Sequence, residues 1–316
     1  MTASRRYAPR ASKIVDFPST PSVRVHSILY DLPVDDVERS LVNLGRAVDL
    51  ARAAGHVGQV DVAFGDCSPS PMLDEATVGR FREELQRQGV SAFHYTFFDA
   101  NLGSAAGQNR LFLVGDSDLV LILNPDTVLA PDTLSELVAA VREPGVGLAE
   151  ARQLPLEHPK AYDPVTGDTS WAATACAIVK ENVFAEVGGF DSQTFFLYCD
   201  DVDLSWRIRL AGYRVVFRPS ARLFHDKRLD VQGRWQVSGA EEYYSAEAAM
   251  LLAHKFSRPD LVMTMRGDLA RRGSELQRKA VVEFDRRERS GELPQPIDPD
   301  HRVAQFINGN YAAHRF

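Results

Sequence analysis

Polar side chains that could do chemistry follow several apolar stretches of this sequence. In chain order they are Tyr30 and Asp31, then Asp66, then Asp126. Each acid alone is an ordinary turn residue or helix cap. If the apolar stretches are parallel strands, their carboxyl ends meet at one edge of the sheet, where ligands bind in α/β proteins. The set therefore predicts a polar pocket at that edge.

Three acids crowd the start of another predicted element, a helix at about 201–211. Asp200, Asp201 and Asp203 lie in its first turn. Acids there complement the helix dipole. Three close negative charges also repel one another, which costs stability unless a cation or a function compensates. Successive helical residues point about 100° apart, so one of the first two acids can face a pocket while the other binds elsewhere.

Two further segments could bind a ligand. Residues 101–110, Asn-Leu-Gly-Ser-Ala-Ala-Gly-Gln-Asn-Arg, enter a helix through small residues, which allow a ligand or a packed element to approach the backbone. This is not a GxxxxGK[ST] phosphate loop, because no Lys-Ser or Lys-Thr follows. His225 ends the segment 221–225, and its spacing leaves open a structural role or metal ligation.

Alternating strands and helices must position these residues. The apolar periodicity predicts strands at 23–29, 59–64, 92–97 and 119–123, with helices at 34–54, 74–88, 104–114 and 131–141. Such alternation indicates a parallel sheet in an α/β domain. The second half predicts a surface excursion at 150–170, a strand at 171–179, a short helix to 187, a last strand at 214–217 followed by the segment 221–225, and helical sequence over 241–289.

Composition excludes several classes of protein. The 316 residues are 45% hydrophobic and 25% charged, which is typical of a soluble globular chain of one or two domains. The net charge of -7 argues against a nucleic-acid binder. Three widely spaced cysteines indicate free thiols in a reducing cytoplasm. No apolar run is long enough to span a membrane, and we expect residues 1–20 to be a loose basic tail.

The motifs together resemble the family 2 glycosyltransferases of the GT-A fold, over about residues 23–227. The most specific match is Gly-Gly-Phe-Asp at 188–191, Phe-Phe-Leu-Tyr at 195–198 and Asp-Asp-Val-Asp-Leu-Ser-Trp-Arg at 200–207, followed by Gly212-Tyr213 and His225. This order is similar to the signature of bacterial rhamnosyltransferase-like members. The segments 101–109 and 124–126 also stand where the family has its motifs.

This resemblance implies a fold and an activity. The fold would be a mostly parallel central sheet flanked by helices, over 21–227, with a helical C-terminal extension at 228–290 and an irregular tail at 291–316. The activity would be inverting transfer of a sugar from a nucleotide-diphospho-sugar, dTDP-rhamnose first and a UDP-sugar second, to a hydroxyl of a glycan or lipid-linked acceptor.

The resemblance also assigns roles to residues. It implies Asp201 as the general base with Asp200 beside it, and Asp126 with His225 as ligands of Mn²⁺ or Mg²⁺. It implies donor binding by Tyr30, Asp31, Asp66, Asn101, Gly103, Asn109, Asn124 and Asp126. On the acceptor side it suggests Trp171, Thr174 and Trp206. Four features depart from the pattern. Asn124 replaces the first acid of the D-x-D motif, Asp200 stands where Glu is usual, Asp31 stands where Asn is frequent, and residues 173–176 replace a loop richer in glycine.

Alternatives to this interpretation stay open. A sugar nucleotidyltransferase shares an α/β nucleotide site, but no phosphate loop rich in glycine and arginine follows 23–29. A non-catalytic scaffold would explain the reduced D-x-D motif. Residues 255–289 hold ten Lys or Arg against six acids. That excess indicates a solvated helical face; the alternatives are docking of a cytoplasmic protein to an anionic membrane surface, or homodimerisation.

Overall fold

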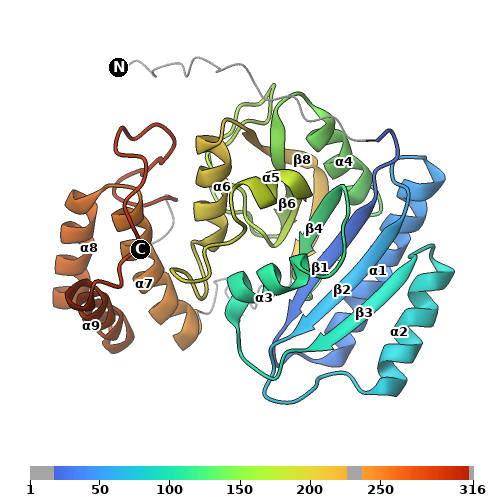
Figure 1. Cartoon of the computed structure of the whole chain (residues 1–316), viewed down its shortest axis with the longest axis horizontal. Coiled ribbons are helices and arrows are strands. Elements are labelled where there is room, and N and C mark those ends of the chain that lie inside the picture. Colours follow the sequence, from blue (N-terminus) through green and yellow to red (C-terminus); the bar gives the residue numbers. More distant parts are fainter. Residues whose placement is uncertain (1–17, 226–236, 313–316) are drawn as a thin grey trace.

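A mixed sheet forms the centre of the molecule. The computed structural model describes residues 18–225 and 237–312 (Figure 1). Within them the strands form one eight-stranded sheet, in the order β3-β2-β1-β4-β7-β6-β8-β5. The strands are β1 (Val23–Leu29), β2 (Val60–Asp66), β3 (Ala92–Phe97), β4 (Leu119–Leu123), β5 (Thr127–Leu129), β6 (Val146–Leu154), β7 (Cys176–Lys180) and β8 (Arg214–His225).

The strand directions bring many chain segments to one edge. β1 runs parallel to β2 and β4, and β2 runs parallel to β3. β7 is antiparallel to both β4 and β6, whereas β6 and β8 are parallel and β5 is antiparallel to β8. The carboxyl ends of β1, β2, β4, β6 and β8 therefore share an edge with the start of β7. The alternation of strands and helices predicted a parallel sheet, so the reversed β7 is a departure from it.

Strand β4 shows why helices cover both faces. All five of its residues are buried. Leu119, Leu121 and Leu123 enter one apolar cluster, and Val120 and Ile122 enter another on the opposite face. Successive side chains of a strand point to opposite faces, so an unbroken apolar run requires a core on each side.

Two sets of helices supply those cores. On the first face lie α1 (Val34–Ala53), α2 (Glu75–Arg87) and α4 (Thr133–Arg142). On the second lie α3 (Gly103–Phe112), α5 (Glu181–Glu186) and α6 (Asp200–Leu210). The predicted helices agree with these bounds to within a few residues.

The last helices pack together beside α6, at one end of the molecule (Figure 1). They are α7 (Gly239–Lys255), α8 (Pro259–Arg272) and α9 (Glu275–Ser290). The helical sequence over 241–289 is thus three helices, separated at Pro259 and at Gly273, as expected for residues that begin or end helices. Trp206 of α6 packs edge-on against Phe256, with ring centroids 4.7 Å apart.

Several expectations from the sequence differ from the structure or concern residues outside the described ranges. The strand expected at 171–179 begins only at Cys176. β5 and β6 were not predicted, and β6 extends into the expected surface excursion. The strand predicted at 214–217 and the segment 221–225 that follows it form one strand, β8, whose register against β6 shifts between Ala151 and Arg152. The tail at 1–17 and residues 226–236 lie outside the described residues. No helix in the described ranges combines the length and apolar character needed to cross a bilayer.

Candidate active site

The predicted polar residues do gather at the carboxyl edge of the sheet. Tyr30 directly follows β1, Asp66 ends β2, and His225 ends β8. Asn124 follows β4, and its backbone N–H donates to the Ala175 carbonyl 2.9 Å away, just before β7. β1, β2 and β4 are neighbours in one sheet and β8 points the same way, so these residues all lie at the carboxyl edge of the sheet.

Hydrogen bonds join the first two strand ends. The Asp66 side chain is fully buried, and its oxygens accept from Ser68 N at 2.9 Å, Met72 N at 2.8 Å and the Tyr95 hydroxyl at 2.5 Å. The Ser68 hydroxyl accepts from Asp31 N at 3.0 Å. Asp66 therefore shapes this turn with both oxygens, so its predicted contact with a nucleotide base stays a prediction. Tyr30 is 48% exposed, and an exposed ring is available for stacking.

Asp126 and His225 lie side by side at the other end of this edge. The Asp126 carboxylate is in the turn between β4 and β5, and Thr127 of β5 is the register partner of His225. His225 Nε2 is 3.4 Å from Asp126 Oδ2. On the other side of the ring, His225 Nδ1 is 2.9 Å from Oε1 of the buried Gln153.

This pair fits part of a divalent metal site. Adjacent ligands of an octahedral ion with bonds of about 2.1 Å lie roughly 3 Å apart, close to the observed separation. The Asp126 side chain is one-third exposed, so its carboxylate remains accessible. In the described part of the chain, no three His, Cys, Asp or Glu side chains cluster as a complete metal site. Diphosphate oxygens would have to complete the coordination, as is common for Mg²⁺.

The acid pair at the start of α6 has two different environments. Asp200 is 5% exposed, and its Oδ2 has no hydrogen-bond partner, whereas Asp201 is partly exposed. Burial raises the pKa of Asp200 to about 7, and the Asp201 charge adds to this, while a hydrogen bond from the Ser104 hydroxyl opposes it. Two adjacent carboxyls with separate environments suit separate roles, as the helical geometry predicted.

Unusual backbone geometry precedes this helix. Tyr198 and Cys199 both have left-handed conformations, with φ of 65° and 56°. Such residues cost on the order of 1–3 kcal/mol each and concentrate at functional sites. Contacts with α3 hold the loop: Ser104 N donates to the Phe196 carbonyl at 3.2 Å. Residues 103 and 104 thereby connect α3 to the start of α6.

The polar side chains of the 101–109 segment bind backbone groups of the protein. Asn101 Oδ1 accepts from Gly103 N at 3.2 Å. Asn109 Nδ2 donates to the Phe190 carbonyl at 2.8 Å, and its Oδ1 accepts from Phe190 N at 2.9 Å. Both ends of the Asn109 amide thus hold the Gly-Gly-Phe-Asp loop, and the predicted donor contact stays a prediction.

Two of the residues predicted on the acceptor side are core residues, which corrects that expectation. Trp206 of α6 is fully buried against the rings of Phe256 and Phe306, and its Nε1 donates to Ser170 Oγ at 3.1 Å. Trp171 is 3% exposed and lies under the ammonium of Lys160, 3.9 Å from the ring centroid. Thr174 is partly exposed beside β7, so its acceptor role stays a prediction.

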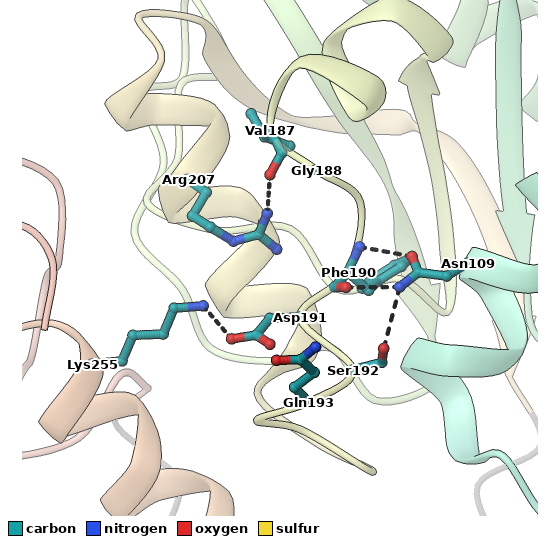
Figure 2. Close-up of a pocket in the computed structure, with 9 residues that line it drawn as sticks. All are labelled: Asn109, Val187, Gly188, Phe190, Asp191, Ser192, Gln193, Arg207 and Lys255. Atoms are coloured by element: carbon teal, nitrogen blue, oxygen red, sulfur yellow. Dashed lines mark hydrogen bonds and ion pairs between the residues drawn. The ribbon is translucent and has the colours of Figure 1, made fainter. Parts of the chain in front are cut away.

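A cleft of about 400 Å³ lies elsewhere, between the Gly-Gly-Phe-Asp loop, α6 and α7 (Figure 2). Its charged groups bind one another. Lys255 Nζ is 2.7 Å from Asp191 Oδ2 and 2.5 Å from Asp203 Oδ1, and Arg207 pairs with Asp203 at 2.7 Å. The lining of this cleft includes Asn109 but none of the strand-end residues. We place the candidate site at the carboxyl edge of the sheet, because most of the predicted polar residues lie there.

Sequence reasoning assigned no role to several buried polar residues. Gln153 and Glu150 lie on the unpredicted strand β6, and Lys255 lies on α7. Glu150 is fully buried, 2.5 Å from Lys160 Nζ, and burial raises its pKa to about 7 in spite of this ion pair. No local pattern gave these residues a role, because their partners lie on other segments. Glu150, Gln153 and Lys255 nevertheless lie in segments already singled out, 150–170 and 255–289, as Ser104 does in 101–110.

Comparisons with known proteins agree with this geometry. No family model matches the sequence. The chain is 27% identical over 238 residues to an N-acetylglucosaminyl-diphospho-decaprenol L-rhamnosyltransferase of Mycobacterium tuberculosis, covering 60% of this chain and 76% of that protein. It is 24% identical over 205 residues to a rhamnosyltransferase of Escherichia coli K12, covering 54% and 77%.

The chain is a glycosyltransferase of the GT-A fold, similar to bacterial rhamnosyltransferases. A solved mannosyltransferase of Pyrobaculum calidifontis, in complex with GDP-Man and Mn²⁺, shares the fold with a TM-score of 0.55 at 17% identity. The match covers 90% of this glycosyltransferase and 80% of that chain. These findings favour the enzyme over the nucleotidyltransferase and scaffold alternatives.

Proposed function

We propose that this glycosyltransferase moves L-rhamnose from a nucleotide-diphospho-sugar to an acceptor hydroxyl with inversion, using Asp201 as the general base. The observation that carries the proposal is the acid pair at the start of α6. Asp200 is buried with a raised pKa, whereas Asp201 is partly exposed. An accessible carboxylate beside a buried acid can accept a proton from a bound hydroxyl.

Each part of the edge has a role in this proposal. The exposed Tyr30 ring would stack on the nucleotide base. Asp126 and His225 would hold a divalent cation that offsets the charge of the diphosphate. The Asp201 carboxylate would take the acceptor proton as the hydroxyl oxygen attacks the anomeric carbon from the face opposite the leaving diphosphate. Loop 195–199, held by α3, orients that carboxylate.

The names of the relatives support the choice of donor and acceptor. One relative is named for rhamnosyl transfer to a lipid-linked diphospho-sugar. We therefore propose dTDP-rhamnose as donor, a UDP-sugar as the second candidate, and a polyprenyl-diphospho-sugar as acceptor, reached from the cytoplasmic face of a membrane. Binding to vesicles that contain the acceptor lipid tests this location, and equal binding to vesicles without it contradicts recognition of that lipid.

A turnover assay tests the reaction itself. The purified chain is incubated with Mn²⁺, dTDP-rhamnose or UDP-sugars, and a polyprenyl-diphospho-N-acetylglucosamine, and both released nucleoside diphosphate and glycosylated acceptor are measured. We expect product with dTDP-rhamnose and a large loss of turnover in EDTA. Full turnover in EDTA would contradict the metal role, and product only with another sugar donor would contradict the rhamnose assignment.

Asp201→Asn tests the base. The amide keeps the size of the side chain but cannot accept the proton, so turnover should fall about a hundredfold or more while donor binding stays normal. Asp35→Asn is the control, because Asp35 is an exposed acid in the first turn of α1 and its loss should cost only about 0.3–1 kcal/mol of stability. If Asp201→Asn keeps more than about a tenth of the turnover, another residue is the base.

A further inference from the structure

Gln153 occupies an unusual place for an uncharged polar residue. It lies near the end of β6, in the register position opposite Leu223 of the parallel strand β8. Its side chain is 1% exposed, and Oε1 is 2.9 Å from Nδ1 of His225. A residue of β6 therefore contacts the imidazole that ends β8, on the side of the ring away from Asp126.

This contact decides which ring nitrogen carries hydrogen. Oε1 is the amide atom of Gln153 that faces the ring, and an amide oxygen can only accept, so this orientation of the amide makes His225 Nδ1 the donor. The neutral ring then has its free lone pair on Nε2, the nitrogen 3.4 Å from Asp126 Oδ2. Histidines that bind metals commonly donate their other ring N–H to such an acceptor, which fixes the tautomer and the orientation of the ring.

The backbone of Gln153 is held by a hydrogen bond, whereas its side-chain amide leaves one donor unpaired, which costs free energy of folding. Its backbone N–H donates to Glu157 Oε2 at 2.7 Å. Its side-chain Nε2 is buried and has no hydrogen-bond partner among the described residues. An unpaired buried donor costs about 1–3 kcal/mol, which an apolar side chain of similar size would avoid. A purely structural position would not favour glutamine.

We infer that Gln153 is a positioning residue that keeps His225 in the Nδ1-protonated tautomer, with Nε2 free to bind a divalent cation beside Asp126. The inference rests on the metal role in the proposed function. It adds a residue that touches neither donor nor acceptor and acts only through His225.

The tautomer can be measured without metal and without turnover. In the metal-free protein labelled with ¹⁵N-histidine, NMR at mildly alkaline pH should show His225 protonated on Nδ1. Gln153→Met, which keeps the volume and removes the acceptor, should abolish that preference. Gln108→Met is the matched control, because Gln108 is buried beside another buried histidine, His26, and should leave the His225 spectrum unchanged. An unaltered His225 tautomer in Gln153→Met would overturn the inference.

Metal affinity gives a second readout. Mn²⁺ is titrated in the presence of saturating dTDP, with free Mn²⁺ followed by electron paramagnetic resonance. Gln153→Met should weaken Mn²⁺ binding by about 10–100-fold. The same change in the His225→Ala background should cause no further loss. Additive losses would show that Gln153 acts through the fold instead, and would overturn the inference.

Two further results are possible: Gln153→Met does not fold, or the wild-type protein binds no Mn²⁺. If Gln153→Met does not fold, Gln153→Asn, which withdraws the acceptor by one methylene, should give the same change of tautomer and affinity, and normal values there would overturn the inference. If the wild-type protein binds no Mn²⁺, the inference fails while the proposed transfer reaction is judged separately, from turnover in EDTA.

Discussion

At the scale of single residues, two buried acids contribute to the pH dependence that we expect for the stability of this glycosyltransferase. Asp200 and Glu150 are both buried, and burial raises the pKa of each to about 7. Asp200 has an oxygen with no partner, while Glu150 has Lys160. Keeping such acids inside a protein costs free energy. Since Asp200 adjoins the proposed base, that cost is explained by function better than by stability.

This burial predicts a pH-dependent free energy of unfolding. In the unfolded chain Asp200 titrates near its ordinary pKa of 3.8, and in the folded state near 7. Between these values the folded state holds more protons, so stability should fall as pH rises from about 4 to about 7. Asp200→Asn should remove part of that fall and be more stable than wild type by about 1–3 kcal/mol above pH 7.

Urea unfolding at a series of pH values measures this effect. Glu150→Gln should remove a separate part of the slope, because that acid also has its pKa raised by burial. A wild-type slope that neither variant changes would contradict the assignment of the two buried acids.

At the scale of elements, the start of α3 depends on one glycine. Gly103 has φ of 70°, and a Cβ there would collide with the Phe196 carbonyl, in the loop that leads to α6. Gly103→Ala should therefore displace this loop and lower both stability and turnover. Gly55→Ala is the matched control: its φ is also 70°, but no atom lies within 4 Å of the added Cβ. That variant should lose only about 1–2 kcal/mol.

Thermal unfolding and turnover of the two variants distinguish the effect of the contact with Phe196 from the effect of the backbone angle. If Gly103→Ala behaves like Gly55→Ala, the contact between α3 and loop 195–199 is not required, and the backbone angle alone accounts for the glycine.

A second element-scale feature is the ion pair between α6 and α7. Lys255 is 6% exposed and pairs with Asp203 and Asp191 (the Asp191 contact is drawn in Figure 2). Breaking a buried pair leaves an uncompensated charge, so Lys255→Met should destabilise the protein by about 3–5 kcal/mol. Adding Asp203→Asn should restore part of this. Lys279→Met, which removes an exposed pair with Glu275, should cost less than about 1 kcal/mol.

Urea unfolding of these variants and of the double variant measures the coupling. If Lys255→Met and Lys279→Met lose the same stability, Lys255 does not hold α7 to α6.

At the scale of the whole molecule, the C-terminal helices share a core with the domain that carries the site. One apolar cluster joins Trp171, Val202 and Trp206 to residues of α7 and α9, including Met250 and Phe284. The basic residues of these helices are largely paired. Lys255 pairs with Asp191 and Asp203, Arg287 with Glu247 and Arg286 with Glu292, and these acids all lie outside 255–289. The excess of cations that suggested membrane docking is therefore partly neutralised within the fold.

This shared core predicts one cooperative unfolding transition. Far-UV circular dichroism and tryptophan fluorescence should give the same urea midpoint, because Trp206 lies at the junction of α6 and α7 and reports on both parts. Limited proteolysis should leave 255–289 intact as long as the domain is folded. Early loss of helical signal, or rapid cleavage throughout 255–289, would show that these helices fold separately.

The sequence by itself determined most of the regular elements and the assignment as a glycosyltransferase. The apolar periodicity placed β1, β3 and β4 at their bounds, because a strand or helix that faces a core repeats apolar residues at its own period. The motifs around Asp126, Asp200 and His225 indicated a GT-A glycosyltransferase, which the fold and the relatives bear out.

Only the tertiary structure decided which side chains meet. β6 was missed because Glu150 and Gln153 interrupt its apolar pattern. These two polar side chains can be buried because Lys160 and His225 bind them. The family resemblance suggested a position on the acceptor side for Trp206, yet Phe256 and Phe306 cover its ring. Asp126 meets His225, 99 positions further along the chain, because β5 pairs with β8. Periodicity is a property of neighbours in sequence, whereas these contacts depend on how distant strands pair.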